Sequence, residues 1–171
     1  MKEYLKNRRL YLSGPIEHGK QENWRTEPTK VFRDVYGLDV FDPFDDPKQQ
    51  WATALWDARK NKDYDTMEEI SHHFVRKDLA IVDRSDIVVS YLPYGVPTTG
   101  TVHEIIISSN AKKPTLLVCP EGREYISFWY YGISLREYMF GSWTELYEYL
   151  DDVNAGKHMD NDRWAYVYGL L

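Results

Sequence analysis

Residues 86–92, Asp-Ile-Val-Val-Ser-Tyr-Leu, are apolar on both alternating faces of an extended chain. A strand with one face in water alternates apolar and polar side chains, so this run predicts a central strand covered by helices on both faces. Similar short runs occur at 9–13, 38–41 and 115–119, with helical spacing of apolar residues between them. This alternation predicts a doubly wound α/β fold, a flavodoxin-like or Rossmann-like parallel sheet with helices on both faces.

The spacing of apolar residues also places the helices. The expected spans are 23–36, about 49–60, 66–84, 101–111 and a last helix that begins at 142. The first helix starts as late as Glu27 if Pro28 is to sit in its first turn. Asp65 or Thr66 is a candidate cap for the third helix, and Ser142 with Glu145 forms a capping box.

Length and net charge limit the number of domains and the kind of ligand that we expect. With 171 residues the chain is long enough for one core and too short for two large ones, so we expect a single domain, 1–171, with a core at about 9–120 and an aromatic extension at 121–171. The formal net charge of -6, without a marked basic run, argues against binding to polymeric nucleic acid.

The chain also lacks sequence signals for export or for a membrane. Cys119 is the only cysteine, so no internal disulfide can form, which fits a reducing cytosol. The first ten residues lack an apolar signal core, and no apolar run approaches the ~18 residues that a membrane span requires. We therefore expect a cytoplasmic protein.

Three loops follow strands and should meet at one edge of the sheet. They are 13–19, 42–46 and 93–104. Ligands of doubly wound sheets bind beyond the carboxyl ends of the strands. This edge is therefore the expected functional site.

The third loop carries the densest set of candidates. Thr98, Thr99, Gly100 and Thr101 precede a helix whose first turn is expected to hold Glu104. Backbone N–H groups at a helix start favour an anion, either the Glu104 carboxylate or a bound phosphate. On spacing alone, Glu104 also fits an ordinary helix cap, and both interpretations stay open.

Four short motifs occur in a characteristic order along the chain. They are Tyr-Leu-Ser-Gly-Pro at 11–15, Phe-Asp-Pro at 41–43, an Asp-X-X-X-X-Asp-X-Ser-Asp pattern from Asp78, and Gly-Thr-Val-His-Glu at 100–104. In this order the chain resembles the nucleoside 2-deoxyribosyltransferase family, with its nucleoside 5'-monophosphate N-hydrolase relatives. The resemblance covers roughly 9–120, and the segment 140–150 looks like the last helix of phage-type members.

The resemblance implies a chemistry for three residues. Glu104 matches the nucleophile that attacks the anomeric carbon and expels the base, leaving a glycosyl ester, a role that suits a carboxylate. Asp78 matches an aspartate that protonates or hydrogen-bonds the base, although it also fits a helix-face charge beside Arg76 and Lys77. Tyr11 matches a tyrosine that positions the nucleophile, although a strand tyrosine is often part of the core.

The resemblance also implies a set of substrate-binding residues. Ser13, Gly14 and Pro15 form a loop that lets a sugar or base approach the backbone, or simply a turn. Asp42 either accepts a hydrogen bond from a base or initiates the turn before Pro43. No cofactor is implied.

The residues of the third loop differ from those that the transferases carry there. Thr98 stands where transferases of free deoxynucleosides tend to carry an acidic residue. The run 98–101, with positive charge from Arg25 and Lys20, instead resembles the loop with which the hydrolases hold a 5'-phosphate.

Two further possibilities concern metals and subunits. His72 and His73 near Glu68 and Glu69 suggest a metal site, but adjacent histidines point in different directions, so we expect none. The family usually forms dimers or larger homo-oligomers, and the aromatic region 128–171 suits such a contact.

The sequence therefore favours an enzyme that moves the sugar of a nucleoside to another base. Hydrolysis of a nucleoside 5'-monophosphate is the alternative, and a non-catalytic nucleotide sensor is the alternative from another class. In each case the partner is a small nucleoside or nucleotide with its base.

Overall fold

The computed structural model describes residues 3–16, 24–46 and 51–171, which form one parallel sheet flanked by helices. Its strands are β1 (Arg9–Ser13), β2 (Asp39–Phe41), β3 (Ile87–Tyr91), β4 (Thr115–Val118) and β5 (Met139–Phe140), in the spatial order β2-β1-β3-β4-β5. Every neighbouring pair is parallel. The expected doubly wound α/β fold is confirmed.

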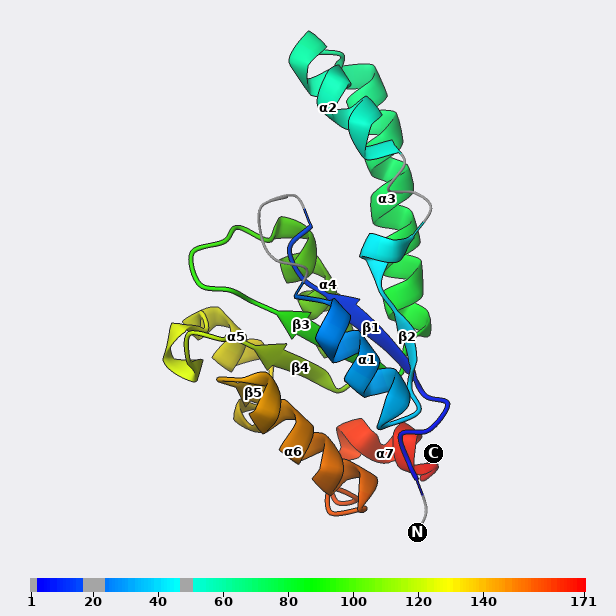
Figure 1. Ribbon diagram of the computed structural model, residues 1–171, viewed down its shortest axis with the longest axis vertical. Helices are drawn as coiled ribbons and strands as arrows, with labels where there is room; N and C mark the ends of the chain where they lie inside the picture. The colour runs from blue at the N-terminus through cyan, green and yellow to red at the C-terminus, as the bar shows by residue number, and fades with distance from the viewer. Residues whose placement is uncertain (1–2, 17–23, 47–50) are drawn as a thin grey trace.

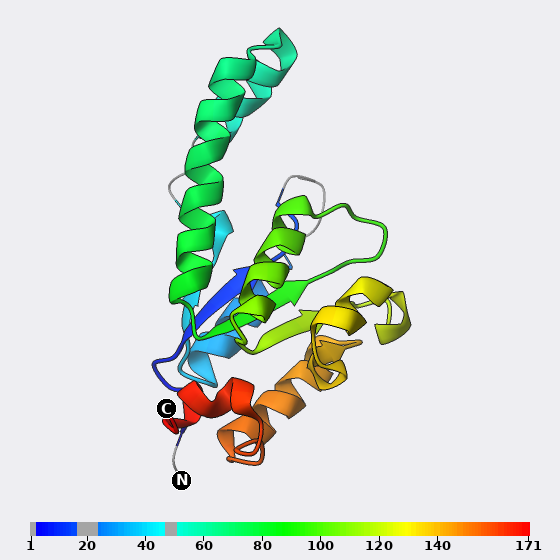
Figure 2. The same ribbon diagram turned by 180° about the vertical axis from the view of Figure 1, so that it is seen from behind.

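Helices cover both faces of the sheet. Helices α1 (Thr26–Asp34) and α6 (Trp143–Asn154) lie over the face seen in Figure 1. The opposite face, seen in Figure 2, carries the lower half of α3 (Tyr64–Arg84), α4 (Thr99–Asn110) and α5 (Phe128–Ile133). Strand β3 is buried on both sides, as its unbroken apolar run predicts.

The order of the strands creates a switch point at the centre of the sheet. The chain passes from β1 outward to β2 and then returns to the other side of β1 to form β3, with Tyr11 beside Val88 and Ser13 beside Ser90. The connections that follow β1 and β3 therefore diverge, leaving a crevice at the carboxyl ends of these two strands. Such crevices are the usual ligand sites of this fold.

Residues 121–171 are part of the same sheet and core. Strand β5 pairs with β4, and Phe140, Leu146 and Trp164 pack in the main apolar cluster. The rest of this region forms short turns at 123–125, 136–138 and 162–164, and helix α7 (Ala165–Tyr168). Ser142 caps α6 as expected, accepting the Glu145 N–H at 3.2 Å, while the Glu145 carboxylate accepts the N–H of Gly141.

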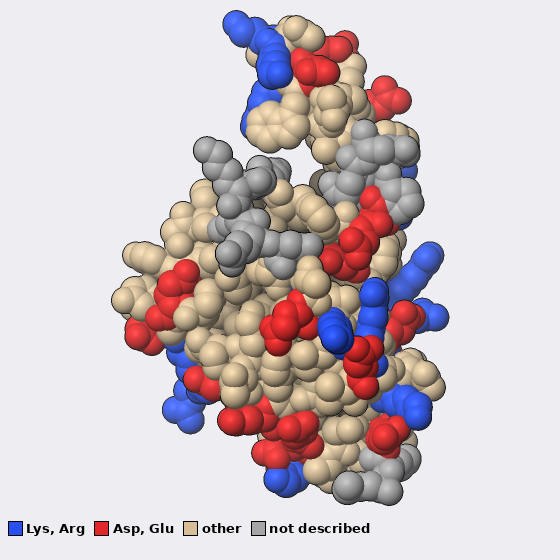
Figure 3. Space-filling view, viewed as in Figure 1, with Lys and Arg blue, Asp and Glu red and all other residues tan. Residues whose placement is uncertain are grey.

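A helical arm projects beyond the carboxyl edge of the sheet. It consists of α2 (Ala52–Asn61) and the first half of α3, which run side by side away from the body (Figures 1 and 2). Within α2 only Ala58 is buried. In Figure 3 the end of the arm stands clear of the rest of the molecule, and basic and acidic side chains are interspersed over this face.

Several expected boundaries shift by a few residues. Helix α3 begins at Tyr64, because Asp63, and not Asp65 or Thr66, is its cap and accepts the N–H of Thr66 at 3.1 Å. Helix α1 ends at Asp34, so Val35, expected on its apolar face, is 65% exposed. The expected helix starts at 23 and 49, residues 17–19 of the first loop, and Lys20 lie outside the described residues.

Within the described ranges, no helix is both long enough and apolar enough to cross a membrane.

Candidate active site

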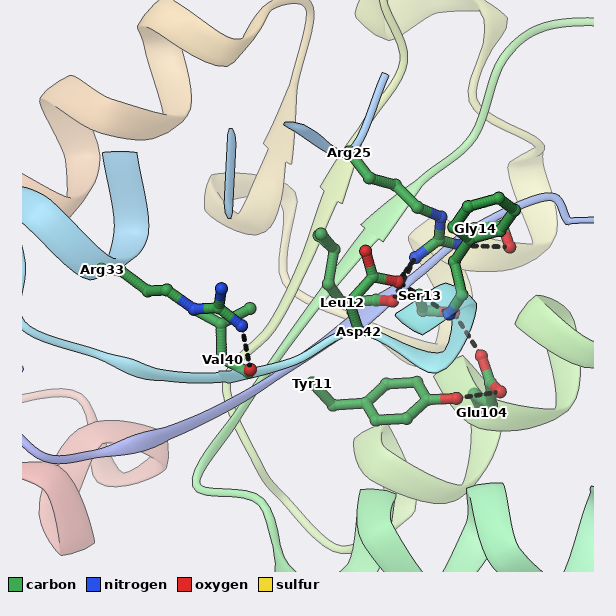
Figure 4. A network of polar contacts seen from close by, with 10 residues as sticks. Tyr11, Leu12, Ser13, Gly14, Arg25, Arg33, Val40, Asp42 and Glu104 are labelled. Carbon is green, nitrogen blue, oxygen red and sulfur yellow. Dashed lines mark hydrogen bonds and ion pairs between the residues drawn. The ribbon is translucent and has the colours of Figure 1, made fainter. Parts of the chain in front are cut away.

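Glu104, on α4, lies against β1, where two hydroxyl groups hold its carboxylate (Figure 4). The Tyr11 hydroxyl donates to Oε1 at 2.7 Å, and the Ser13 hydroxyl donates to Oε2. Glu104 is buried, and both partners are fully buried. Two neutral donors stabilise the carboxylate as an anion and fix its orientation, because each donor binds a different oxygen.

The alternation of the strand explains why both donors face the same way. Tyr11 and Ser13 are two residues apart on β1, so their side chains point to the same face, toward α4. Leu10 and Leu12 point to the other face and join the main apolar cluster. A single short strand thus contributes Leu10 and Leu12 to the core on one face and the Tyr11 and Ser13 hydrogen bonds to Glu104 on the other.

The position of Glu104 in its helix differs from the expectation. Helix α4 begins at Thr99, so Glu104 stands in the second turn, and no acidic residue lies in the first. Its carboxylate reaches across to β1. The expected first-turn position is therefore wrong, and Glu104 does not cap the first turn of α4.

The environment of Tyr11 keeps its hydroxyl protonated. Burial raises the pKa of Tyr11 far above its ordinary value, and the nearby charges of Glu104 and Asp78 raise it further. The hydroxyl is therefore a permanent donor at any physiological pH. Asp78, half-buried on α3, is thus one of the charges that act on Tyr11.

Arg25 and Asp42 form a buried ion pair beside this site. Arg25 Nη1 lies 2.6 Å from Asp42 Oδ1, and both side chains are almost fully buried. Burial lowers the pKa of Arg25 from a very high starting value, and Asp42 opposes that shift. Burial likewise raises the pKa of Asp42, opposed by Arg25. Asp42 also accepts the backbone N–H of Phe44 at 2.9 Å, as a turn-initiating aspartate does.

Gly14 lies where the chain leaves β1, and a side chain there has no room. A Cβ at this position would meet two ring atoms of Trp24 at 2.5 and 2.9 Å. The Trp24 ring stacks on Tyr91, with centroids 4.4 Å apart. Pro15 follows, half-buried. The close approach of an aromatic ring, and not only the turn, thus requires glycine after Ser13.

The start of α4 is open to solvent beside Glu104. Thr98 caps the helix without a side-chain hydrogen bond to its first turn, Thr99 and Gly100 are exposed, and Thr101 is buried. A Cβ at Gly100 would meet nothing within 4 Å. The first N–H groups of the helix are therefore accessible to an anion.

The histidines of the arm do not form a metal site. His72 Nε2 lies 3.9 Å from Glu68 Oε1 on the exposed side of α3. In the described part of the chain, no group of three His, Cys, Asp or Glu side chains is placed to hold a metal ion.

Two contacts of the site were not foreseen. Ser13 was expected only to shape a loop, yet its hydroxyl binds Glu104; the signal was its position two residues after Tyr11 on the same strand face. Lys77 Nζ donates to the buried Asp46 carboxylate at 2.7 Å and links α3 to the turn that follows β2. No local pattern identifies that pair, because 31 residues separate its members.

Comparisons with known proteins support the fold. No protein-family model and no curated protein matches the sequence. Among solved structures, the chain is similar to a 2-deoxyribosyltransferase from the psychrotolerant bacterium Bacillus psychrosaccharolyticus, with a TM-score of 0.57 and 21% identity. The match covers 81% of this chain and 89% of that one. At this identity the likeness establishes a shared fold.

Proposed function

We propose that this protein is a nucleoside 2-deoxyribosyltransferase-like enzyme that cleaves the N-glycosidic bond of a nucleoside and passes the sugar to another base. One observation carries the proposal: a buried carboxylate, Glu104, held by Tyr11 and Ser13 at the carboxyl edge of β1 and β3. The four ordered sequence motifs and the likeness to a solved 2-deoxyribosyltransferase support it.

The first step forms a covalent intermediate. A Glu104 oxygen attacks the anomeric carbon, the bond from that carbon to the base nitrogen breaks, and the base leaves with the electron pair. Asp78, in its protonated form, gives its proton to the leaving nitrogen. The product is a glycosyl ester on Glu104, and Tyr11 holds the reacting carboxylate in place throughout.

The second step regenerates the enzyme. A nitrogen of the incoming base attacks the anomeric carbon, the ester bond breaks, and Glu104 leaves as a carboxylate. The incoming base loses a proton to Asp78, so the proton balance of the first step is restored. Two displacements at one carbon give retention of configuration.

The remaining candidates surround the position of the sugar and base. Ser13 orients the nucleophile, and Gly14 lets the Trp24 ring pack closely against the turn that follows Ser13. The open start of α4, from Thr98 to Thr101, faces the sugar end of the substrate. Asp42 and Arg25 form a buried ion pair next to the carboxyl end of β1.

A second candidate function is hydrolysis of a nucleoside 5'-monophosphate, with water in place of the incoming base. The start of α4 favours it. Thr98 replaces the acidic residue expected for free deoxynucleosides, and the exposed N–H groups at Thr99 and Gly100 suit a phosphate. The space beside Gly100 leaves room for that group.

The exposed aromatic residues support a homo-oligomer. Phe128 is 90% and Trp129 is 70% exposed, next to Tyr125 and Tyr131. Large exposed rings gathered in one place are typical of a protein interface. Trp164 and Tyr168, in contrast, are buried in the core of the same chain, so only part of the aromatic C-terminal region is available for a partner.

The test is a panel of nucleosides and their 5'-monophosphates, incubated with and without a second base and analysed by chromatography. Product that requires the second base identifies a transferase, and free base formed in water identifies a hydrolase. Incubation with a 2-fluoro sugar analogue, followed by mass spectrometry, should show one added sugar on Glu104. No turnover together with a ligand-induced rise in Tm would indicate a nucleotide sensor and refute the enzyme proposal.

A further inference from the structure

The Arg25 guanidinium binds the backbone on both sides of Ser13. Its Nη1 donates to the carbonyl of Leu12 at 2.9 Å, and its Nη2 donates to the carbonyl of Gly14 at 2.9 Å (Figure 4). Nη1 also donates to Asp42. One planar group thus holds the residue before and the residue after the serine that binds Glu104.

We propose that Arg25 is a positioning residue: by fixing the Leu12–Gly14 backbone it places the Ser13 hydroxyl against the Glu104 carboxylate, and it does not bind substrate. This inference rests on the proposed function, in which Glu104 is the nucleophile. It reassigns both Arg25 and Asp42, for which the sequence suggested contacts with the substrate. Asp42 instead orients the guanidinium.

The chemistry of the guanidinium suits this role. Arginine presents several N–H groups in a rigid planar fork, so it can bind two carbonyls and a carboxylate with a fixed geometry. The Trp24 ring covers one face of the group, with 4.3 Å from Cζ to the ring centroid. Lysine carries the same charge on a flexible stem and cannot reproduce that arrangement.

The surroundings of Arg25 argue against contact with a substrate phosphate. Its side chain is 3% exposed, and three protein acceptors already surround it. The neighbouring surface groove, of about 320 Å³, has a balanced set of charged lining residues: Arg25, Lys30, Arg33, Asp34, Asp42 and Asp45. Three carboxylates beside three cations give an anion no net attraction.

The packing of Trp24 links the same turn to the sheet. The ring lies between Arg25 on one side and Tyr91 of β3 on the other, and it fills the space next to Gly14. Movement of the guanidinium therefore releases Gly14 and Trp24 together. The position of the Ser13 hydroxyl depends on both.

The experiment compares Arg25→Lys and Arg25→Met with Arg33→Met as the matched control. Arg33 lies on α1, the helix that Arg25 precedes, is exposed, and donates to the carbonyl of Val40 at 3.0 Å. Each variant is assayed with a deoxynucleoside and with the corresponding 5'-monophosphate. These two substrates differ only in the phosphate, so they separate positioning from phosphate binding.

For a positioning residue, both Arg25 variants should lose kcat about 100-fold on both substrates, with KM within about threefold of the parent, because small misplacement of a reacting group has effects of this size. Arg33→Met should stay within about twofold of the parent. A loss confined to the monophosphate and expressed in KM, or full activity of Arg25→Lys, would overturn the proposal.

A second measurement does not depend on turnover. A crystal structure of Arg25→Lys should show Glu104 in place on α4, with the Ser13 hydroxyl displaced from its hydrogen bond to Oε2. An unchanged Ser13–Glu104 contact in that variant would refute the positioning role. Absence of activity in the parent protein would refute the proposed function, and this structure would still decide the role of Arg25.

Discussion

Glu104 and Glu68 lie in helices of the same molecule, yet their surroundings are opposite. Glu104 of α4 is buried, and hydroxyl groups from β1 bind both of its oxygens. Glu68, on the helical arm, has an exposed side chain whose Oε1 lies 3.9 Å from Nε2 of the equally exposed His72. A buried side chain stays ionised only where the fold provides hydrogen-bond or charged partners for it, whereas a charge in water needs no such partner.

The same contrast holds for the two regions as a whole. The crevice at the carboxyl ends of β1 and β3 is bordered by buried polar side chains of β1 and α4 that hydrogen-bond one another, whereas the arm buries little more than Ala58 of α2. Substitutions in the crevice should therefore alter function strongly, and substitutions on the arm should alter it little. Four variants test this difference.

Glu104→Ala should have the largest effect. The proposed nucleophile is removed, so turnover should fall at least ~10³-fold, about 4 kcal/mol of activation free energy, while much of the substrate binding remains. Steady-state kinetics and a thermal melt measure the two properties separately. Activity within tenfold of the parent would show that another group is the nucleophile.

Gly14→Ala should come next. The new Cβ would lie 2.5 Å from the Trp24 ring, so the turn after Ser13 or the ring must move. We expect a loss of about 100-fold in kcat, from displacement of Ser13, and about 1–3 kcal/mol in the free energy of unfolding. Gly132→Ala, on α5 and outside the site, is the matched control, because its Cβ meets nothing within 4 Å.

Asp78→Asn should have an effect that is at most as large as that of Gly14→Ala and that depends on the leaving base. An amide cannot donate the proton, so activity should fall about 10²-fold for bases that are difficult to protonate and less for those that leave easily. Rates measured for a series of bases of increasing basicity test this. A uniform loss across the series would assign Asp78 a structural role.

Glu68→Ala should change almost nothing. An exposed i, i+4 pair contributes little, so activity should stay within about twofold and the free energy of unfolding within about 0.5 kcal/mol. The same kinetic assay and melt as for Glu104→Ala provide a direct comparison. A large loss of activity here would mean that the arm takes part in catalysis or in a contact that catalysis needs.

Local patterns in the sequence were sufficient to predict the sheet. The short apolar runs at β1 and β3 depend only on neighbouring residues, so strand positions and the doubly wound order could be inferred. The capping box at Ser142 was predicted for the same reason. The edge that carries Glu104 followed from the general rule for parallel sheets.

The contacts that define the site were harder to predict because they join distant residues. Nothing near Arg25 in the sequence indicates that its guanidinium binds Leu12, Gly14 and Asp42. The start of α4 was placed too late, since Thr99 and Gly100 resemble loop residues, and this misplaced Glu104 in the first turn. Contacts between side chains that are far apart in the sequence leave no pattern among neighbouring residues from which they could be predicted.

The two hydrogen bonds of Glu104 also have a consequence for folding kinetics. They join residues 91 and 93 positions apart, so the carboxylate acquires its donors only after α4 has packed against β1. Contacts of such high sequence separation form slowly. During refolding, the recovery of activity should therefore lag behind helix formation. Activity is then a measure of the assembled sheet and its helices, not of any single segment.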